Sequence, residues 1–87
     1  PSVVMDVVAL FGKNVRTLRD REGLSQEELA FRAGMKRSYL SDLERGTSNH
    51  SVRALGRLAE ALRVAPSRLL EDPSTSETDS NVVVRSR

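Results

Sequence analysis

Four polar side chains near the middle of the chain have the spacing of one helix face. On a helix, Ser38, Ser41 and Asp42 share one side. Arg37 lies beside them, and the apolar Leu40 lies opposite. Such a face fits the major groove of DNA, about 12 Å wide, where each base pair presents its own pattern of donors and acceptors. Arg37 is the first candidate for contacting bases, because one guanidinium can donate to guanine O6 and N7 together.

The hydroxyls and the carboxylate of this face leave more than one interpretation. Ser38 is able to contact several bases. Asp42 either accepts from a cytosine amino group or repels phosphate and so fixes the register of the helix on the duplex. A surface carboxylate paired with a nearby arginine explains Asp42 equally well. The predicted base contacts are therefore Arg37, Ser38, Ser41 and Asp42, with the pairing of Asp42 as an alternative.

Two short helices joined by a glycine are predicted to hold this face. Ser25 precedes a helical pattern and Glu28 follows three residues later, so the two can form a reciprocal capping box. The first helix then starts near Gln26. Gly34 suits the left-handed turn that ends this helix, and a second helix runs from there to Gly46. Two short helices meeting at a glycine resemble a helix-turn-helix.

A longer helix is predicted ahead of this pair. Its apolar stripe is formed by Val7, Leu10, Phe11, Val15 and Leu18. The β-branched valines at the start and Gly12 inside are weak helix formers, so the ordered helix is expected to begin near Asp6. The surplus of apolar residues in this stretch, Val4, Val7, Val8 and Phe11, has two interpretations. They cover the domain's own core, which is favoured, or they contact a second subunit.

Two more helices are predicted after residue 46. Ser51 caps a helix that ends around Arg63. The inner face of this helix is expected to consist of Val52, Leu55, Leu58, Ala59 and Leu62. Pro66 favours the first turn of a last short helix, in which Leu69 and Leu70 point inward. The sequence therefore predicts an all-α fold of five helices with no strand pattern.

Composition limits the size and the chemistry of this domain. The chain has 87 residues, no cysteine and a single histidine, His50. Residues 1–72 are predicted to form one helix-turn-helix domain, and the polar residues 73–87 a flexible tail. Disulfides and thiolate metal sites are excluded, and we expect no metal, no cofactor and no enzymatic site, because the serines serve as caps and on the exposed face. Without an apolar run of about 20 residues, no membrane is expected and the cytoplasm is the default location.

Charge is distributed unevenly along the chain. Residues 1–70 carry 12 basic and 8 acidic side chains, whereas residues 71–87 carry 2 basic and 4 acidic ones. All but two of the 14 basic residues are arginine, whose planar fork suits phosphate and guanine edges. The basic domain fits a nucleic-acid partner, although ordinary solvated arginines would give the same count.

Four motifs in a fixed order connect the chain with a known family. They are LR at residues 18–19, GLSQEELA at 23–30, YLSDLERG at 39–46 and LAEAL at 58–62. From Phe11 to Leu70 the sequence resembles the Cro/C1-repressor type helix-turn-helix domain, or xenobiotic-response-element family, which includes phage repressors, restriction-modification controller proteins and many antitoxins. The resemblance implies a five-helix, lambda-repressor-like DNA-binding fold. It departs from the family at His50, where proline is usual.

The resemblance also implies contacts with the DNA backbone. The positions that match those of the family are Gln26, Lys36, Tyr39, Asn49 and Arg53. Gln26 stands at a helix N-terminus, where free amides and the positive end of the helix dipole attract phosphate, but it is also a good helix-starting residue. Tyr39 could instead cover the hinge as part of the core, and His50 has the simpler interpretation of a surface loop residue.

Arg19 and Glu44 match two positions that the family pairs between its first and third helices. The implied ion pair is largely buried, and its role would be to orient the helices. Removing one partner of such a pair is costly because the other charge is stranded. The alternative is an exposed arginine and an exposed glutamate that do not meet.

The implied function is that of a sequence-specific, double-stranded-DNA-binding transcriptional regulator, a repressor or controller protein, acting at the nucleoid. A homodimer on a roughly palindromic operator is expected, because one recognition helix contacts only a few base pairs. The dimer surface is expected around Pro66–Leu70, with the valine-rich N-terminus as second candidate. The alternative function is an antitoxin or accessory module that binds a partner protein through the N-terminus or the tail.

Overall fold

The computed structural model describes residues 6–47 and 49–72. Its elements are α1 (Val7–Arg21), α2 (Gln26–Ala33), α3 (Arg37–Arg45), α4 (Val52–Leu62) and the 3-10 helix η1 (Pro66–Leu70). No strand occurs in these two ranges, so the all-α class is confirmed. The predicted count of five helices needs one correction, because the last element is a single 3-10 turn. The expected tail, and the N-terminal segment 1–5 with Val4, lie outside the described residues.

The helix starts follow the local chemistry of the sequence. Asp6 and Ser51 each accept a hydrogen bond, at 3.1 Å, from the backbone amide three residues later, so they cap α1 and α4. The capping box of α2 is complete. Ser25 Oγ accepts from the Glu28 amide at 3.0 Å, and Glu28 Oε1 accepts from the Ser25 amide at 2.8 Å. These bonds satisfy amides that a helix N-terminus leaves without partners.

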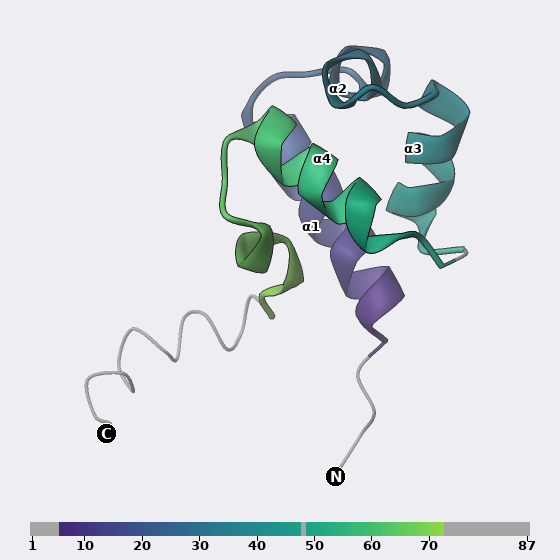
Figure 1. The fold of residues 1–87 in the computed structure, drawn as a ribbon, viewed down its shortest axis with the longest axis vertical. Coiled ribbons are helices and arrows are strands. Elements are labelled where there is room, and N and C mark those ends of the chain that lie inside the picture. The colour runs from purple at the N-terminus through teal and green to yellow at the C-terminus, as the bar shows by residue number, and fades with distance from the viewer. Residues whose placement is uncertain (1–5, 48, 73–87) are drawn as a thin grey trace, which may run out of the picture.

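One hydrophobic core joins all five elements. Its fully buried members are Val15, Leu29, Leu40, Leu43, Leu58 and Leu69. In Figure 1, α4 lies in front of α1, α2 lies at the top, α3 lies to the right of α4, and η1 lies on the other side of α4 from α3. α1 packs against α3 and η1, and α2 packs against α4. The core therefore holds one side of α3 against α1, and the opposite side of α3 faces solvent.

Three side chains predicted to point inward are exposed. Val52 is 81% exposed, Val7 51% and Leu70 40%. Val7 and Val52 are the first residues of their helices. Leu70 follows the fully buried Leu69, and adjacent residues of a 3-10 helix, with three residues per turn, cannot both face one core. The core interpretation holds for Phe11, which is buried, and only in part for Val8, which is half-buried.

Two residues of α1 connect it to elements far away in the sequence. Asn14 is buried, and its Nδ2 donates to the carbonyls of Leu69 and Glu71, at 2.9 Å each, which ties η1 to α1. Gly12 lies where α1 touches α3. A Cβ on Gly12 would lie 2.2 Å from the carbonyl oxygen of Leu43. This glycine is therefore required by the close approach of two backbones and does not disturb the helix.

Candidate nucleic-acid interface

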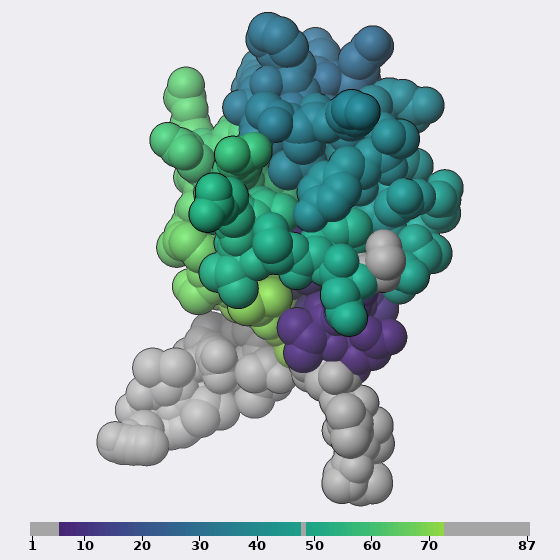
Figure 2. All heavy atoms as spheres, turned by 45° about the vertical axis from the view of Figure 1, so that its right-hand side comes forward, coloured from purple at the N-terminus to yellow at the C-terminus, as the bar shows by residue number. Residues whose placement is uncertain are grey.

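The exposed side of α3 carries the four predicted base-contacting residues. Gly34, at φ 70°, takes the left-handed conformation that ends α2, and α3 begins three residues later. The four residues comprise Arg37 and Ser38, which are exposed, and Ser41 and Asp42, which are half-exposed. The α3 residues turned the other way, toward the core, are fully buried. Figure 2 turns the side of the molecule that carries α3 toward the viewer.

Asp42 meets an arginine of its own helix. Arg45 Nη2 donates to Asp42 Oδ1 in a short contact, and Arg45 Nη1 lies 3.5 Å from Ser41 Oγ. The surface pairing that sequence reasoning kept as an alternative is therefore present in the structure. Arg45 was not among the predicted contacts, and its place one turn after Ser41 was the signal that could have identified it.

Behind this face, Arg19 and Glu44 form a bidentate ion pair between α1 and α3. Arg19 Nε donates to Glu44 Oε2 at 2.7 Å and Arg19 Nη2 donates to Oε1 at 3.0 Å. The side chains are 12% and 4% exposed, respectively. Arg19 Nη1 also donates to the carbonyl of Leu24 at 2.8 Å. The hydrogen bonds to Glu44 raise the pKa of Arg19, against the effect of burial.

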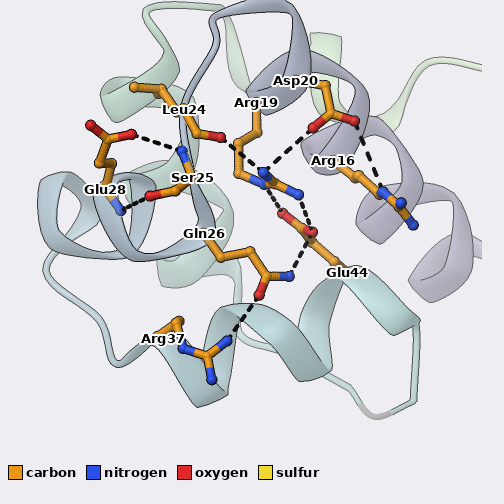
Figure 3. Close-up of polar contacts among 9 residues, drawn as sticks. All are labelled: Arg16, Arg19, Asp20, Leu24, Ser25, Gln26, Glu28, Arg37 and Glu44. Atoms are coloured by element: carbon orange, nitrogen blue, oxygen red, sulfur yellow. Dashed lines mark hydrogen bonds and ion pairs between the residues drawn. The ribbon is translucent and has the colours of Figure 1, made fainter.

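Gln26 links this buried pair to the exposed face. Its Nε2 donates to Glu44 Oε1 at 3.0 Å, and its Oε1 accepts from Arg37 Nη1 at 3.2 Å. Only this orientation of the amide satisfies both neighbours, because a carboxylate accepts and a guanidinium donates. Four of the side chains drawn in Figure 3 thus form one chain of hydrogen bonds, which runs from Arg19 through Glu44 and Gln26 to Arg37. Gln26 does more than start a helix.

The other predicted backbone contacts lie around the start of α3 and before α4. Lys36, the N-cap residue of α3, is exposed, as are Asn49 and Arg53. Tyr39 is half-buried and packs against the core, and its ring meets the edge of the His50 ring at a centroid distance of 4.8 Å. His50 is half-buried, and its ring nitrogens make no hydrogen bond to the described part of the chain. The structure brings Lys36, Tyr39 and Arg53 together around one cleft, which Asn49 does not line.

The family model described as Helix-turn-helix matches residues 15–69, from the middle of α1 into η1. The chain belongs to the Cro/C1-type helix-turn-helix family. Control protein C.BamHI of Bacillus amyloliquefaciens is 44% identical over 63 residues, which cover 71% of this chain and 78% of that protein. The crystal structure of the restriction-modification controller protein C.AhdI from Aeromonas hydrophila has a TM-score of 0.69 and 45% identity, over 71% of this chain and 94% of that one. The structure of SinR in complex with DNA has a TM-score of 0.66 and 35% identity, over 70% of this chain and 98% of that one.

The family's helix-turn-helix corresponds here to α2 and α3, and the residues around it offer hydrogen-bond donors and charge. The described residues contain no group of three or more side chains that could hold a metal ion. They also contain no helix of the length and apolarity needed to cross a membrane. What the arrangement offers is a row of donors and acceptors along α3, flanked by cations on the neighbouring elements.

Proposed function

We propose that this chain is a sequence-specific, double-stranded-DNA-binding regulator of transcription, acting in the cytoplasm at the nucleoid. The observation that carries the proposal is the hydrogen-bonded chain from the buried Glu44 through Gln26 to Arg37. It gives a long, exposed arginine at the start of α3 a preferred direction, which a surface arginine without a positional role does not need. Relatives named as a control protein and as a restriction-modification controller protein, and SinR solved with DNA, support the same function.

In this function α3 enters the major groove. Arg37 contacts guanine by donating two hydrogen bonds from its guanidinium, while Ser38 and Ser41 contact neighbouring base edges. Asp42 has a different role, because Arg45 already neutralises its charge. The pair presents an acceptor beside a donor, so Asp42 orients Arg45 toward the duplex at least as much as it contacts a base.

The flanking residues hold the duplex without specifying its sequence. Lys36 and Arg53 contribute positive charge, and Asn49 contributes an amide from the loop before α4. Tyr39 contributes its hydroxyl while its ring stays on the core. Such contacts to phosphate and sugar fix the register and supply affinity.

A homodimer completes the proposal. A shallow apolar groove of about 170 Å³ is lined by Val7, Val8, Phe11, Val52, Leu55 and Leu70, with His50 and Ser51. Both surfaces that the sequence nominated for dimerisation, the start of α1 and the end of η1, contribute to it. Its three exposed apolar members, Val7, Val52 and Leu70, would lose water on contact with a second copy, which makes this groove the best candidate for the dimer surface.

Selection of bound duplexes from a random pool tests the function and the symmetry together. The expected result is an enriched motif with two inverted half-sites, roughly 34 Å or one helical turn apart. A pool without any enriched motif would contradict sequence-specific binding. A motif without two-fold symmetry would contradict the homodimer and leave DNA binding intact.

Base substitution in the selected duplex tests the role of Arg37. Arg37→Ala should weaken binding by about 1 to 3 kcal/mol and relax the preference at one position of each half-site. The base positions assigned to Ser38 and Ser41 serve as internal comparisons, since Arg37→Ala should keep the base preference of the unmodified protein there. An Arg37→Ala variant that retains that preference at every position would show that this residue does not contact bases.

A further inference from the structure

A basic cleft lies between the turn that joins α2 to α3 and the first half of α4. It measures about 300 Å³ and is lined by Met35, Lys36, Tyr39, Ser51, Arg53, Ala54 and Arg57. The elements on its two sides adjoin on the face turned toward the viewer in Figure 2. Three of the lining residues are cations, and no carboxylate is among them. Like charges around one cleft repel each other, so an anion seated there is favoured.

Arg57 lines this cleft from α4 and was not among the DNA contacts predicted from the sequence. It follows Arg53 by one helical turn, so the two side chains project from the same side of α4. Its Nη1 donates to the carbonyl of Gly34 at 3.3 Å. The guanidinium has five N–H donors, and among the described residues it makes no ion pair with a carboxylate. Most of its donors are therefore free, while one bond fixes its direction.

The neighbouring depression on the other side of Arg57 is different. Its lining includes Arg32 and Arg63, but also Glu60 and the exposed Phe31. A carboxylate among these arginines balances part of the charge. The cleft next to α3 is thus the more positive of the two, because no carboxylate opposes its cations, and Arg57 is the residue that lines both depressions.

We propose that this cleft binds a backbone phosphate of the DNA duplex, and that Arg57 is a phosphate-binding residue together with Lys36 and Arg53. The proposal rests on the proposed function, because the phosphate belongs to the duplex that α3 contacts. Arginine suits this role since its planar fork can donate two parallel bonds to one phosphate. The bond to Gly34 holds the guanidinium in place beforehand, which reduces the ordering that binding requires. The competing explanation is that Arg57 only fastens α4 to the turn between α2 and α3.

Salt titrations of duplex binding separate these explanations. The probe is a fluorescently labelled duplex carrying the selected motif, and the measurement is the slope of log K against log salt concentration. Each phosphate contact contributes about 0.9 to that slope. Arg57→Gln should flatten it by about 0.9 per half-site, which for two half-sites corresponds to about a 12-fold smaller loss of affinity between about 50 and about 200 mM salt. The ranking of base preferences should not change, because phosphate contacts carry no sequence information.

Arg32→Gln is the matched control. It removes the same charge from the neighbouring depression, outside the cleft, and should keep the slope of the unmodified protein. Arg57→Lys keeps a cation in the cleft and should also keep that slope. If Arg57→Gln melts out before binding can be measured, Arg57→Met takes its place, because it also removes the charge and keeps the aliphatic stem. A slope that is flatter by about 0.9 per half-site then supports the proposal, and the unmodified slope overturns it.

Three results would overturn the inference. They are an unchanged slope in Arg57→Gln, an equal flattening in Arg32→Gln, and a lowered melting temperature in Arg57→Gln and Arg57→Lys with both slopes unchanged. The last result would show that Arg57 only stabilises the fold through its hydrogen bond to the Gly34 carbonyl. A flat salt response of the unmodified protein would instead contradict the proposed function. A steep response that Arg57→Gln leaves unaltered contradicts the phosphate cleft only.

Discussion

Replacing Glu44 by alanine should destabilise the domain more than it disturbs any single DNA contact. The carboxylate is 4% exposed and accepts three hydrogen bonds, two from Arg19 and one from Gln26. In Glu44→Ala the Arg19 side chain, which is 12% exposed, loses its buried counter-charge. It keeps the carbonyl of Leu24 at 2.8 Å and the exposed carboxylate of Asp20 at 3.4 Å. Stranding one partner of a buried pair costs about 3 to 5 kcal/mol. The retained bond and the residual exposure favour the lower end of that range.

Thermal unfolding followed by circular dichroism measures this loss. For a domain of this size, a change of 1 kcal/mol shifts the melting temperature by about 4 to 8 °C, so a drop of at least about 12 °C is expected. Arg16→Ala is the control, because its contact with Asp20 is exposed and 4.0 Å long and should contribute less than about 0.5 kcal/mol. A Glu44→Ala variant that melts within about 3 °C of the unmodified protein would refute the assignment of a stabilising, buried pair.

A double replacement distinguishes stability from orientation. Arg19→Met combined with Glu44→Leu removes both charges and fills the space, and such replacements are often neutral or stabilising. The melting temperature should therefore recover. Gln26 nevertheless loses the carboxylate that fixes the orientation of its amide, so the amide oxygen no longer holds Arg37 in one direction. The recovered domain should show a weaker preference at the base that Arg37 is proposed to contact, and a fully retained preference would contradict the positional role of the pair.

Three further predictions concern packing, assembly and pH. Gly12→Ala should destabilise the domain by about 1 to 3 kcal/mol in urea unfolding, because its Cβ would lie 2.2 Å from a backbone oxygen. The control is Gly56→Ala, which has open space around it and should stabilise α4 by about 0.5 to 1 kcal/mol. Equal effects of the two substitutions would contradict the close approach of α1 and α3 at Gly12. Val52→Glu should shift the protein to monomer in sedimentation equilibrium, because Val52 lines the apolar groove. Phe31→Glu should not, because Phe31 is about as exposed but lies outside that groove. A Val52→Glu variant that still forms a dimer would exclude the groove as the dimer surface. The backbone amide of Ser25 donates to the Glu28 carboxylate and lowers the pKa of this carboxyl. The stabilisation of the fold by this hydrogen bond is therefore present at neutral pH and is lost as the pH falls through the folded-state pKa. Glu28→Gln should therefore show a flatter dependence of melting temperature on acidic pH, and parallel curves would contradict this.

The parts of the fold that the sequence predicted are those that short-range chemistry decides. The caps formed by Ser25 and Ser51 each involve an amide three residues away, so the hydroxyl and the helical pattern sufficed to place them. Gly34 and Gly46 end their helices in the left-handed conformation for the same local reason. The order of these elements then followed from the four motifs.

The misplaced residues depend on neighbours that are distant in the sequence. Val52 has an apolar side chain at a helix start, and only the position of α1 and η1 decides that nothing covers it. From the sequence, Gly12 is expected to weaken α1, whereas in the structure the backbone of α3 lies too close to leave room for a Cβ at this position. Asn14 carried no signal at all, because the carbonyls that satisfy its amide are 55 and 57 residues away. Burial at an element's edge is a tertiary property that periodicity alone does not determine.

Gln26 shows how local and distant information combine at the site itself. The family position implies a phosphate contact, and the structure engages both ends of its amide within the protein. The two roles are compatible, because the amide nitrogen has two N–H donors and Glu44 accepts only one of them. The second donor remains for a phosphate at the start of α2, where the helix dipole favours an anion. In the proposed complex one side chain would then bind the backbone and direct Arg37 at once, so that the same residue would set the register of the duplex and the orientation of the base contact.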